Sequence, residues 1–393
     1  MIIMGAGPAG NGAAYRLAAL GHDVVVLEYR EQIGDKLCTG IVGGECIERF
    51  GPVEPRVFRE LWAATFVLPS GKTIRIDMGR PYAYVIDRVH FVASLALKAQ
   101  QAGAVYPLNR RVTGVVVDGE GVTVRAVSAG REEVFKGRAL VLATGFASRF
   151  TKALGLGTVE DFVFGVQAEV RTEGLMETEL YLGRRVAPGF FGWVAPISDD
   201  RALVGLLARQ SPINYLKYLV SNLRAQGKVV EVTGRPGKWG IPLTPLPRTY
   251  SERVLVVGDA AGQVKPTTGG GIYYSLLCAE LAAETLHKAL ALEDLSARRL
   301  REYETLWKKR LGRELRVGFY ARRMYEALGD RQVEYLMNTI AHNGIHRDIV
   351  QGRLSSFDWH AELILKGMSH RAIRGVMEPL KSLIPFFPWR GGG

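Results

Sequence analysis

Cysteine is scarce in this chain: among 393 residues there are three, Cys38, Cys46 and Cys278, and no two of them form a CxxC pair. A fold built on disulfides and a zinc site built on cysteines are therefore both disfavoured. No uninterrupted apolar run approaches the roughly 18 residues that a membrane-spanning helix needs. The chain also lacks the GxSxG turn and the GxxxxGK(S/T) loop, which argues against serine hydrolases and P-loop NTPases.

Glycine and positive charge, in contrast, are abundant. The 46 glycines show no three-residue period, so the excess belongs to turns and ligand-binding loops rather than to collagen. Hydrophobic residues make up 47% of the chain, enough for a sizeable core, and its length suggests two or three folding units. The net charge of +12 fits an anionic partner, such as nucleic acid, a membrane surface or a phosphorylated substrate.

The first residues show no basic region and no cleavage site, so we expect no signal peptide. With few cysteines as well, we expect a cytoplasmic protein, and contact with the inner surface of the membrane is a further expectation.

The first thirty residues have the pattern of a βαβ unit. An apolar strand at 2–4 leads into Gly5-Ala6-Gly7-Pro8-Ala9-Gly10, a helix pattern follows, and the apolar run 23–28 predicts a second buried strand that ends in Glu28. In a GxGxxG turn the first glycine permits the tight bend, the second lets the backbone approach a pyrophosphate, and the third allows close helix–strand packing. The helix start offers unpaired N–H groups to phosphate, and Glu28 can accept hydrogen bonds from ribose hydroxyls. This predicts a dinucleotide site that uses Gly5, Gly7, Ala9, Gly10 and Glu28.

The remaining pattern predicts an α/β protein with a Rossmann-like domain in several pieces. Buried parallel strands are expected at 139–143 and 253–259, a helix at 271–292, and short antiparallel strands over 161–245. We expect the dinucleotide-binding domain to comprise residues 1–60, 88–160 and 246–290. Residues 61–87 and 161–245 would form an antiparallel-sheet substrate domain, and 291–393 a C-terminal helical segment.

A second glycine-rich turn follows the strand at 253–259. It contains Gly258-Asp259-Ala260-Ala261-Gly262 and then Lys265-Pro266-Thr267-Thr268-Gly269-Gly270-Gly271-Ile272. This order resembles the second FAD fingerprint of the para-hydroxybenzoate-hydroxylase-like flavoproteins. The resemblance implies that FAD is the cofactor and that Asp259 binds its ribityl chain. It also implies that Gly269, Gly270, Gly271 and Ile272 face the N1/C2 carbonyl edge of the flavin, where negative charge develops on reduction.

Between the two fingerprints, Tyr84-Val85-Ile86-Asp87-Arg88 matches a stretch in which the arginine of that family lies near FAD. A surface ion pair is the alternative for Arg88. For Asp87, the alternative is an N-cap of the helix that follows.

Within the superfamily, the chain resembles the geranylgeranyl reductases, especially the archaeal enzymes that saturate the isoprenoid chains of membrane lipids. Three stretches within residues 1–290 carry this resemblance: Lys36-Leu37-Cys38-Thr39-Gly40, the segment Pro188–Pro196 around Phe191 and Trp193, and the 265–271 loop. The 188–196 segment departs from the family's Tyr-x-Trp-x-Phe-Pro pattern, with Phe191 for the Tyr and Ala195 for the Phe. The resemblance places the cysteine loop, with Lys36, Cys38, Thr39 and Gly40, beside the flavin.

By that resemblance the substrate is a prenyl lipid and the reaction is reduction of double bonds in geranylgeranyl chains. An isolated alkene has no carbonyl to draw electrons, so we expect proton donation to accompany hydride transfer, with Cys38 or an ordered water as the proton source. Phe191 and Trp193 would line a channel for the chain, or else belong to the core. For Cys38 the alternative is an inert buried thiol. A flavin monooxygenase of the same superfamily and an electron-transfer flavoprotein feeding quinone are the alternative functions.

One departure bears on the electron donor. The hydroxylases carry Ala-Asp-Gly where this chain has Ala143-Thr144-Gly145, and their Asp-Gly helps to engage both FAD and NADPH. Thr144 and Gly145 are still expected at the cofactor, but without that carboxylate. We therefore expect a low-potential donor such as ferredoxin, a protein or another reduced cofactor, in preference to direct use of NADPH.

The C-terminal part is basic, with Lys308, Lys309, Arg310 and further arginines up to Arg323. A solvated helix face and contact with anionic lipid headgroups both fit this stretch. Its aromatics are not interleaved as in nucleic-acid-binding modules, so we expect no nucleic-acid partner.

The apolar segment 383–389 has the composition of an interfacial anchor. His342 and His346 are four residues apart, but no carboxylate pattern completes a metal site, and we expect none.

Overall fold

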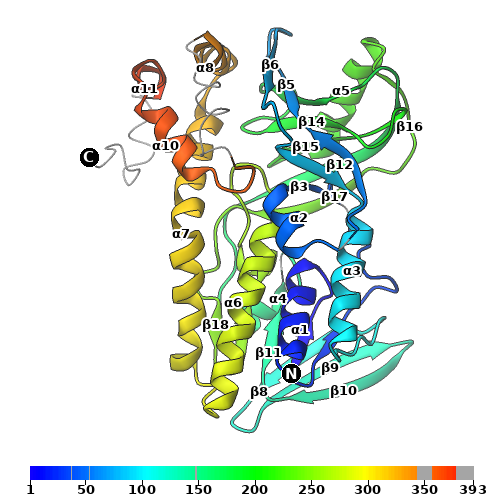
Figure 1. The fold of residues 1–393 in the computed structure, drawn as a ribbon, viewed down its shortest axis with the longest axis vertical. Coiled ribbons are helices and arrows are strands. Elements are labelled where there is room, and N and C mark those ends of the chain that lie inside the picture. The colour runs from blue at the N-terminus through cyan, green and yellow to red at the C-terminus, as the bar shows by residue number, and fades with distance from the viewer. Residues whose placement is uncertain (37, 53, 147, 343–355, 378–393) are drawn as a thin grey trace.

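The computed structural model describes residues 1–36, 38–52, 54–146, 148–342 and 356–377. Figure 1 shows helices packed on sheets throughout, with a small parallel sheet in the lower half and a larger sheet in the upper half. The predicted α/β class is confirmed.

A five-stranded sheet forms the centre of the lower half, in the order β18-β19-β11-β1-β2. Its strands are β1 (Ile2–Met4), β2 (Val25–Leu27), β11 (Leu140–Leu142), β18 (Tyr250–Ser251) and β19 (Val254–Val256). All pairs are parallel except the edge pair β18–β19. The inner strands are apolar and almost completely buried because both faces of the sheet are covered. The parallel strands predicted at 2–4, 23–28, 139–143 and 253–259 are all present.

Successive side chains of each strand point to opposite faces of this sheet, so its residues contribute to two separate cores. Ile3, Val26 and Val141 pack on one face against three helices, α1 (Pro8–Ala19), α3 (Arg88–Gln101) and α6 (Ile272–Ala291). Ile2 and Leu140 pack on the other face against an antiparallel meander. The meander consists of β8 (Arg111–Val117), β9 (Val122–Ser128) and β10 (Arg131–Gly137), followed after β11 by the short helix α4 (Arg149–Ala153).

The upper half is built on an eight-stranded sheet. Its strands, in sequence order, are β5 (Ala63–Val67), β6 (Thr73–Asp77), β12 (Phe162–Thr172), β13 (Thr178–Leu182), β14 (Phe191–Pro196), β15 (Arg201–Ala208), β16 (Val229–Val232) and β17 (Gly237–Pro242). The strands within 161–245 pair antiparallel, as predicted. β5 and β6 extend this sheet, and β5 pairs with β13 in parallel. A parallel pair is feasible there because a long stretch of chain separates the two strands.

One helix on this sheet was not predicted. α5 (Pro212–Ala225) interrupts the region expected to contain only strands and turns. Its signals were present in the sequence: proline at the first helical position and an apolar spacing at Leu216, Leu219, Val220 and Leu223. α5 covers the outer face of the sheet, where Leu219 packs against Gly192 of β14.

A fourth sheet, with three strands, joins the halves. It contains β3 (Ile41–Gly43), β7 (Ala83–Ile86) and β4 (Val57–Leu61), and α2 (Gly44–Phe50) follows β3 directly. It therefore carries the loop before residue 41 to the junction between the two large sheets.

The described C-terminal residues are helical, as predicted. The helices are α7 (Ala297–Ala327), α8 (Asp330–His342), α10 (Ala361–Ser369) and α11 (Arg371–Met377). α7 runs along α6 through both halves (Figure 1): Tyr303 and Trp307 are buried in the helical core of the lower half, whereas Val317 and Met324 belong to an upper apolar cluster. One long helix thus ties the two halves together.

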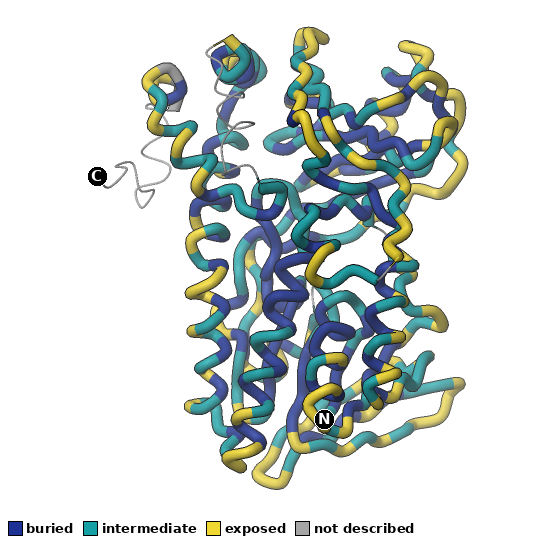
Figure 2. Tube along the Cα trace, viewed as in Figure 1, coloured by how far each residue is buried: buried dark blue, intermediate teal, exposed yellow. Residues whose placement is uncertain are grey.

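Burial follows this layering. Figure 2 shows buried residues along the parallel strands and the inner sides of α1 and α6, with exposed residues along the outer side of α7. In the part of the chain that the structure describes, no helix is both long and apolar enough to cross a bilayer.

Candidate functional site

A cavity of about 540 Å³ lies where the parallel strands end. Met4, Leu27, Ala143 and Val257, at or just beyond the carboxyl ends of four strands, all line it. This is the edge at which open α/β sheets bind ligands. The residues predicted from the sequence that line it are Gly5, Gly7, Ala9, Glu28, Lys36, Cys38, Arg88, Thr144, Gly145, Asp259, Gly269, Gly271 and Ile272.

The first glycine turn bends as its sequence predicts. Gly5 has φ +103°, and a β-carbon there would stand 2.4 Å from the Ala143 carbonyl oxygen. At Gly10, a β-carbon would stand 1.8 Å from the Gly5 carbonyl oxygen, so only glycine lets α1 pack this closely on β1. Gly10 therefore shapes the turn without lining the cavity. At Gly7 a β-carbon would meet no atom within 4 Å, which leaves open space at the start of α1.

The start of α1 is suited to an anion. Gly7 caps the helix and has no side chain to bond the first-turn N–H groups, and Pro8 stands within the first turn. These N–H groups are available to a ligand, with the positive end of the helix dipole behind them.

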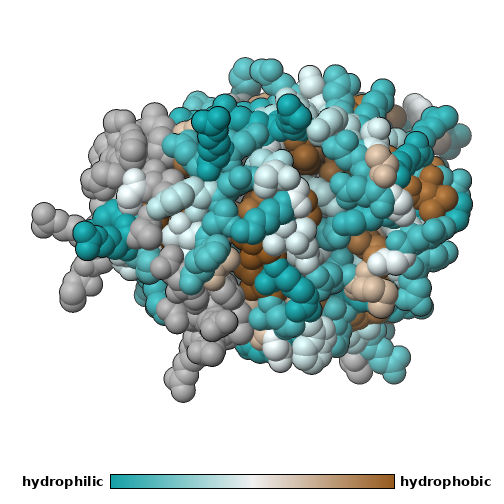
Figure 3. Space-filling model, turned by 90° about the horizontal axis from the view of Figure 1, so that it is seen from above, coloured by the Kyte–Doolittle hydropathy of each residue, from teal (hydrophilic) through white to brown (hydrophobic). Residues whose placement is uncertain are grey.

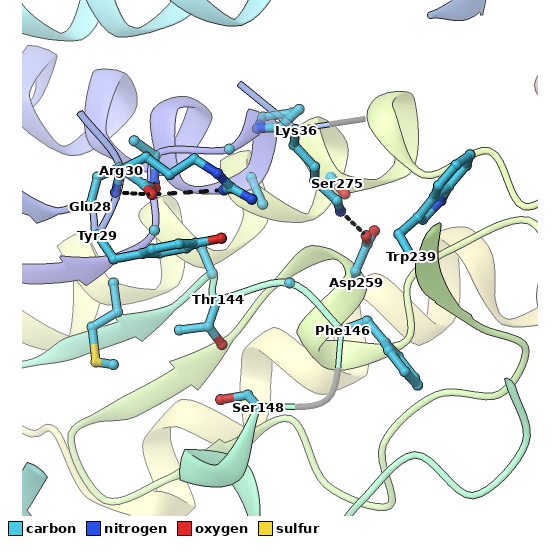
Figure 4. Close-up of a pocket in the computed structure, with 18 of the residues that line it drawn as sticks. Glu28, Tyr29, Arg30, Lys36, Thr144, Phe146, Ser148, Trp239, Asp259 and Ser275 are labelled. Atoms are coloured by element: carbon cyan, nitrogen blue, oxygen red, sulfur yellow. Dashed lines mark hydrogen bonds and ion pairs between the residues drawn. The ribbon is translucent and has the colours of Figure 1, made fainter. Parts of the chain in front are cut away.

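Glu28 directly follows β2 and has a buried carboxylate. Its Oε2 accepts a hydrogen bond from the Ala6 N–H at 2.8 Å, and its Oε1 accepts one from the Arg30 N–H at 3.0 Å. The Arg30 guanidinium lies 3.8 Å from Oε1 (Figure 4). Each oxygen retains acceptor capacity, so the carboxylate can hold the glycine turn and accept hydroxyl donors together.

Lys36 and Asp259 meet across the cavity. Lys36 Nζ lies 2.8 Å from Asp259 Oδ2, and Figure 4 shows the two side chains reaching toward each other from separate walls. Asp259 lies in the short 3-10 helix Gly258–Ala261 that follows β19. The ion pair therefore connects the cysteine loop with the second fingerprint.

Arg88 lines the cavity and anchors the main chain that leads into the cysteine loop. Its Nη1 donates to the carbonyl oxygens of Gly34 and Lys36, both at 2.6 Å. The residue is buried, unlike an arginine in a surface ion pair. Asp87 is the N-cap of α3, because its carboxylate accepts from the His90 N–H at 2.9 Å.

The cysteine loop itself is fixed on the C-terminal side of Cys38. Cys38 is half-buried and lines the cavity. Thr39 Oγ1 lies 2.6 Å from Oε1 of the buried Gln167 in β12, and the Gly40 carbonyl accepts from the Ile86 N–H. Thr39 and Gly40 do not line the cavity, so they position Cys38. Leu37 lies outside the described residues.

The second glycine turn provides another uncapped helix start. α6 begins at Ile272, and Gly271 caps it without a side-chain hydrogen bond. Gly269 has φ +74°, a conformation that glycine adopts most readily. Gly269, Gly271 and Ile272 line the cavity, whereas Gly270 lies behind them. The cavity thus runs between the N-terminal ends of two helices.

Several lining residues were not predicted. Phe146 and Trp239 form an aromatic wall, which Figure 4 shows beyond Asp259. Gly240 accommodates the Phe146 ring, and Gly165 accommodates the Trp239 indole. Neither residue belongs to a sequence motif. The one indication in the sequence is a glycine within each neighbouring strand, which often marks a place where another side chain approaches the backbone closely. Nearby, Thr144 Oγ1 is buried and has no hydrogen-bond partner among the described residues, so it can serve a ligand.

Phe191 and Trp193 do not line this cavity. They alternate on β14 and share its inner face, because Gly192 between them faces α5. Trp193 pairs with Gly205, whose neighbour across the sheet is Gln167, the residue bonded to Thr39. The Trp193 indole N–H is buried without a partner among the described residues. The pair therefore stands on the sheet face that meets the cysteine loop.

Two further predictions cannot be placed. His346 and the apolar segment 383–389 lie outside the described residues.

Comparison with known proteins identifies relatives of this chain. A relative from Methanocaldococcus jannaschii, named digeranylgeranylglycerophospholipid reductase, is 31% identical over 354 residues, 86% of this chain and 90% of that protein. The chain belongs to the geranylgeranyl reductase family. It also belongs to the family described as "Lycopene cyclase protein", whose profile matches residues 1–347.

Solved structures show the same fold for this geranylgeranyl reductase family member. A geranylgeranyl bacteriochlorophyll reductase-like protein from Thermoplasma acidophilum is 24% identical, has a TM-score of 0.83 and covers 98% of both chains. A flavin-dependent brominase is 16% identical, has a TM-score of 0.70 and covers 97% of this chain and 98% of its own. The fold is thus shared by proteins whose names describe different chemistry.

Proposed function

We propose that this protein is an FAD-dependent reductase that saturates double bonds in geranylgeranyl chains of archaeal-type membrane lipids or related polyprenyl compounds. The observation that carries the proposal is the cavity itself, which joins Glu28 and the uncapped start of α1 to the uncapped start of α6, with Cys38 on its wall. The relatives in this family are named as reductases of such lipids.

The residues of the cavity fit FAD from end to end. Glu28 would accept the ribose hydroxyls, and the N–H groups at the start of α1 would receive the pyrophosphate. Asp259 would bind the ribityl chain, and the start of α6 would face the carbonyl edge of the flavin. Bound FAD would supply the two electrons as a hydride. The aromatic wall of Phe146 and Trp239 would limit water near the cofactor.

We propose an apolar path to this site from the upper end of the molecule. Figure 3 shows hydrophobic side chains in the middle of that end, surrounded by hydrophilic ones. The upper apolar cluster includes partly buried Phe66, Tyr325 and Leu336, and Phe191 belongs both to it and to the core of the large sheet. Trp193 follows, with its ring centroid 6.1 Å from that of Phe191. We propose that the prenyl chain follows these residues toward the cysteine loop.

Cys38 is our candidate for the proton source. Its thiol lies on the cavity wall, in a loop that Arg88 and Gln167 hold in place. An isolated alkene needs a proton as it accepts a hydride, so a positioned donor would lower the barrier. An ordered water is the alternative donor.

For the reductant, we propose a low-potential donor such as ferredoxin in preference to NADPH. Thr144 stands at the cavity where the hydroxylases have a carboxylate, and the sequence has no second GxGxxG turn for a separate nucleotide.

The test combines cofactor analysis with turnover. Purified protein should be yellow and release FAD, not FMN, on denaturation. Under anaerobic conditions with dithionite, it should add two hydrogens per double bond to a digeranylgeranylglycerophospholipid, as measured by mass spectrometry. A colourless protein that FAD cannot reconstitute would refute the cofactor, and a flavoprotein that leaves the lipid unchanged would refute the substrate.

A further inference from the structure

A C-terminal segment packs directly behind the second glycine turn. Residues 356–361 lie next to Lys265–Ile272, although about ninety residues separate them along the chain. Lys265 Nζ lies 2.9 Å from Asp358 Oδ1 and donates to the Phe357 carbonyl at 2.9 Å. Lys265 is 4% exposed and Asp358 is 2% exposed. No sequence motif pointed to this ion pair.

The segment is fixed from several directions. Glu314 of α7 accepts the N–H groups of His360 and Ala361, both at 2.8 Å. Tyr274 of α6 donates to the Asp358 carbonyl at 2.8 Å, and Trp359 donates to Glu45 of α2 at 2.9 Å. The segment that carries Asp358 is therefore held in position by three helices.

The positive end of the pair lies against the backbone that lines the cavity. A β-carbon on Gly270 would lie 2.8 Å from Lys265 Cε and 3.4 Å from its Nζ, so the ammonium stands directly behind the Gly269–Gly271 backbone. Gly269 and Gly271 line the cavity on the other side of that backbone. The Asp358 carboxylate lies against Gly43 of β3, where its Oδ2 has no hydrogen-bond partner among the described residues.

Lys265 also shapes the turn through its main chain. Its N–H donates to the Gly270 carbonyl at 3.0 Å, and its carbonyl accepts from the Gly269 N–H at 2.9 Å. Fixing the side chain of Lys265 therefore fixes the backbone that leads into α6.

We propose that Lys265 and Asp358 are positioning residues for the flavin: the pair sets the turn before α6 and presents positive charge to the cavity, which raises the reduction potential of bound FAD. The proposal rests on the FAD-dependent function given above. A reduced flavin carries negative charge at its N1/C2 edge, and a cation behind a single layer of backbone in a buried setting stabilises that charge strongly. Stability alone is a weak explanation for a buried ion pair, because the free energy of desolvation offsets much of the attraction between its charges.

The experiment measures the reduction potential of FAD in Lys265→Met, Lys265→Arg and Asp358→Asn, by anaerobic spectroscopic titration against redox dyes. Lys265→Met should shift the oxidised-to-reduced equilibrium at least tenfold toward oxidised flavin, a fall of about 30 mV for a two-electron couple. Lys265→Arg should retain most of the wild-type value. Asp358→Asn leaves the ammonium unpaired and should shift the potential upward.

Lys308→Met is the matched control. It removes an equal charge from an exposed ion pair with Glu304 on α7, and it should leave the potential unchanged. A Lys265→Met protein that keeps FAD at the wild-type potential would overturn the proposal, and so would shifts of the same sign in Lys265→Met and Asp358→Asn. If Lys265→Met fails to fold, Asp358→Asn decides by the sign of its shift. Unfolding of all three variants would show that the pair serves stability alone and would overturn the proposal.

Wild-type FAD content and lipid turnover are measured on the same preparations. A wild type without FAD would count against the proposed function, whereas a wild type that binds FAD and reduces lipid, with unshifted variants, would count against this inference alone.

Discussion

Lys36 and Asp259 are 223 residues apart in the chain, yet their charged atoms meet at 2.8 Å across the cavity. Each comes from a different glycine-containing loop, so the ion pair sets the distance between the two walls. We expect it to hold the apoprotein in a shape that is ready for FAD.

Asp259→Ala should therefore lower FAD affinity. The substitution removes the acceptor that we propose for the ribityl chain and leaves the Lys36 ammonium without its partner. A hydrogen bond to a charged group is worth about 1.5–3 kcal/mol, so binding should weaken about 10- to 100-fold. Flavin fluorescence titration of apoprotein measures the change. Glu284→Ala, which breaks an exposed pair with Arg16, is the control and should bind FAD normally. Unchanged affinity in Asp259→Ala would show that the second fingerprint is misplaced.

Gly7→Ala and Gly10→Ala should separate ligand binding from folding. A methyl group on Gly7 meets no protein atom and would project into the open space at the helix start, so the apoprotein should keep its melting temperature and bind FAD weakly. On Gly10 the methyl group would collide with the Gly5 carbonyl, which should destabilise the protein by about 2 kcal/mol or more. Calorimetry of both apoproteins, followed by FAD titration, tests the contrast. Equal destabilisation by both would contradict it.

NADPH should reduce the flavin slowly compared with dithionite or reduced ferredoxin. The reason is that Thr144 offers a neutral hydroxyl where the hydroxylases use a carboxylate. Anaerobic stopped-flow measurement of flavin absorbance compares the donors directly. Fast reduction that saturates with NADPH would refute the expectation.

His360 should make stability depend on pH below neutrality. Burial, together with the nearby Lys265 ammonium, lowers the pKa of His360 to about 3, from 6.5 in its ordinary state. Its Nε2 lies 2.8 Å from the Phe357 carbonyl and its Nδ1 lies 2.8 Å from Thr267 Oγ1, so the neutral ring donates from Nε2 and accepts at Nδ1. The folded state thus excludes a proton that the unfolded chain binds below about pH 6.5. Stability from this group is complete above that pH and is lost as the pH falls toward 3.

The comparison is between the wild type and His360→Gln. Between pH 7 and pH 5 the wild type should lose about 2 kcal/mol more than the variant, by denaturant titration. Parallel pH profiles for the two proteins would argue against a neutral, buried His360.

Binding to membranes should depend on anionic lipid and on salt. α7 exposes Lys309, Arg313 and Arg316, and each basic residue near an anionic surface contributes on the order of 1 kcal/mol. Co-sedimentation with anionic liposomes should fall at high salt, in Lys309→Glu/Arg313→Glu, and on deletion of residues 383–393. Equal binding to neutral and anionic liposomes, or to neither, would remove the membrane contact and leave the flavin chemistry untouched.

The sequence determined the parts of the site that lie within a few residues of one another. A GxGxxG turn between a strand and a helix has one geometry, because Gly5 needs a positive φ and Gly10 must have no side chain, and the structure follows it. Glu28 follows from the same unit, since the next parallel strand ends at the same edge of the sheet. The second turn was recognisable for the same reason. Helix α5 was not predicted, although Pro212 and the apolar spacing after it are typical of a helix, because strand patterns surround it on both sides.

Tertiary structure alone decided how distant segments meet. No periodicity relates Lys36 to Asp259, Thr39 to Gln167, or Lys265 to Asp358, because each pair forms only when separate loops, sheets and helices pack together. The positions of Phe146 and Trp239 on the cavity wall also depend on packing between distant segments. Neither aromatic side chain belongs to a sequence motif, and each lies where a glycine of a neighbouring strand leaves room for its ring. The backbone conformation of a turn depends on adjacent residues and can be predicted from them. Contacts between segments far apart in the chain, such as Lys265 and Asp358, depend on how the whole fold packs.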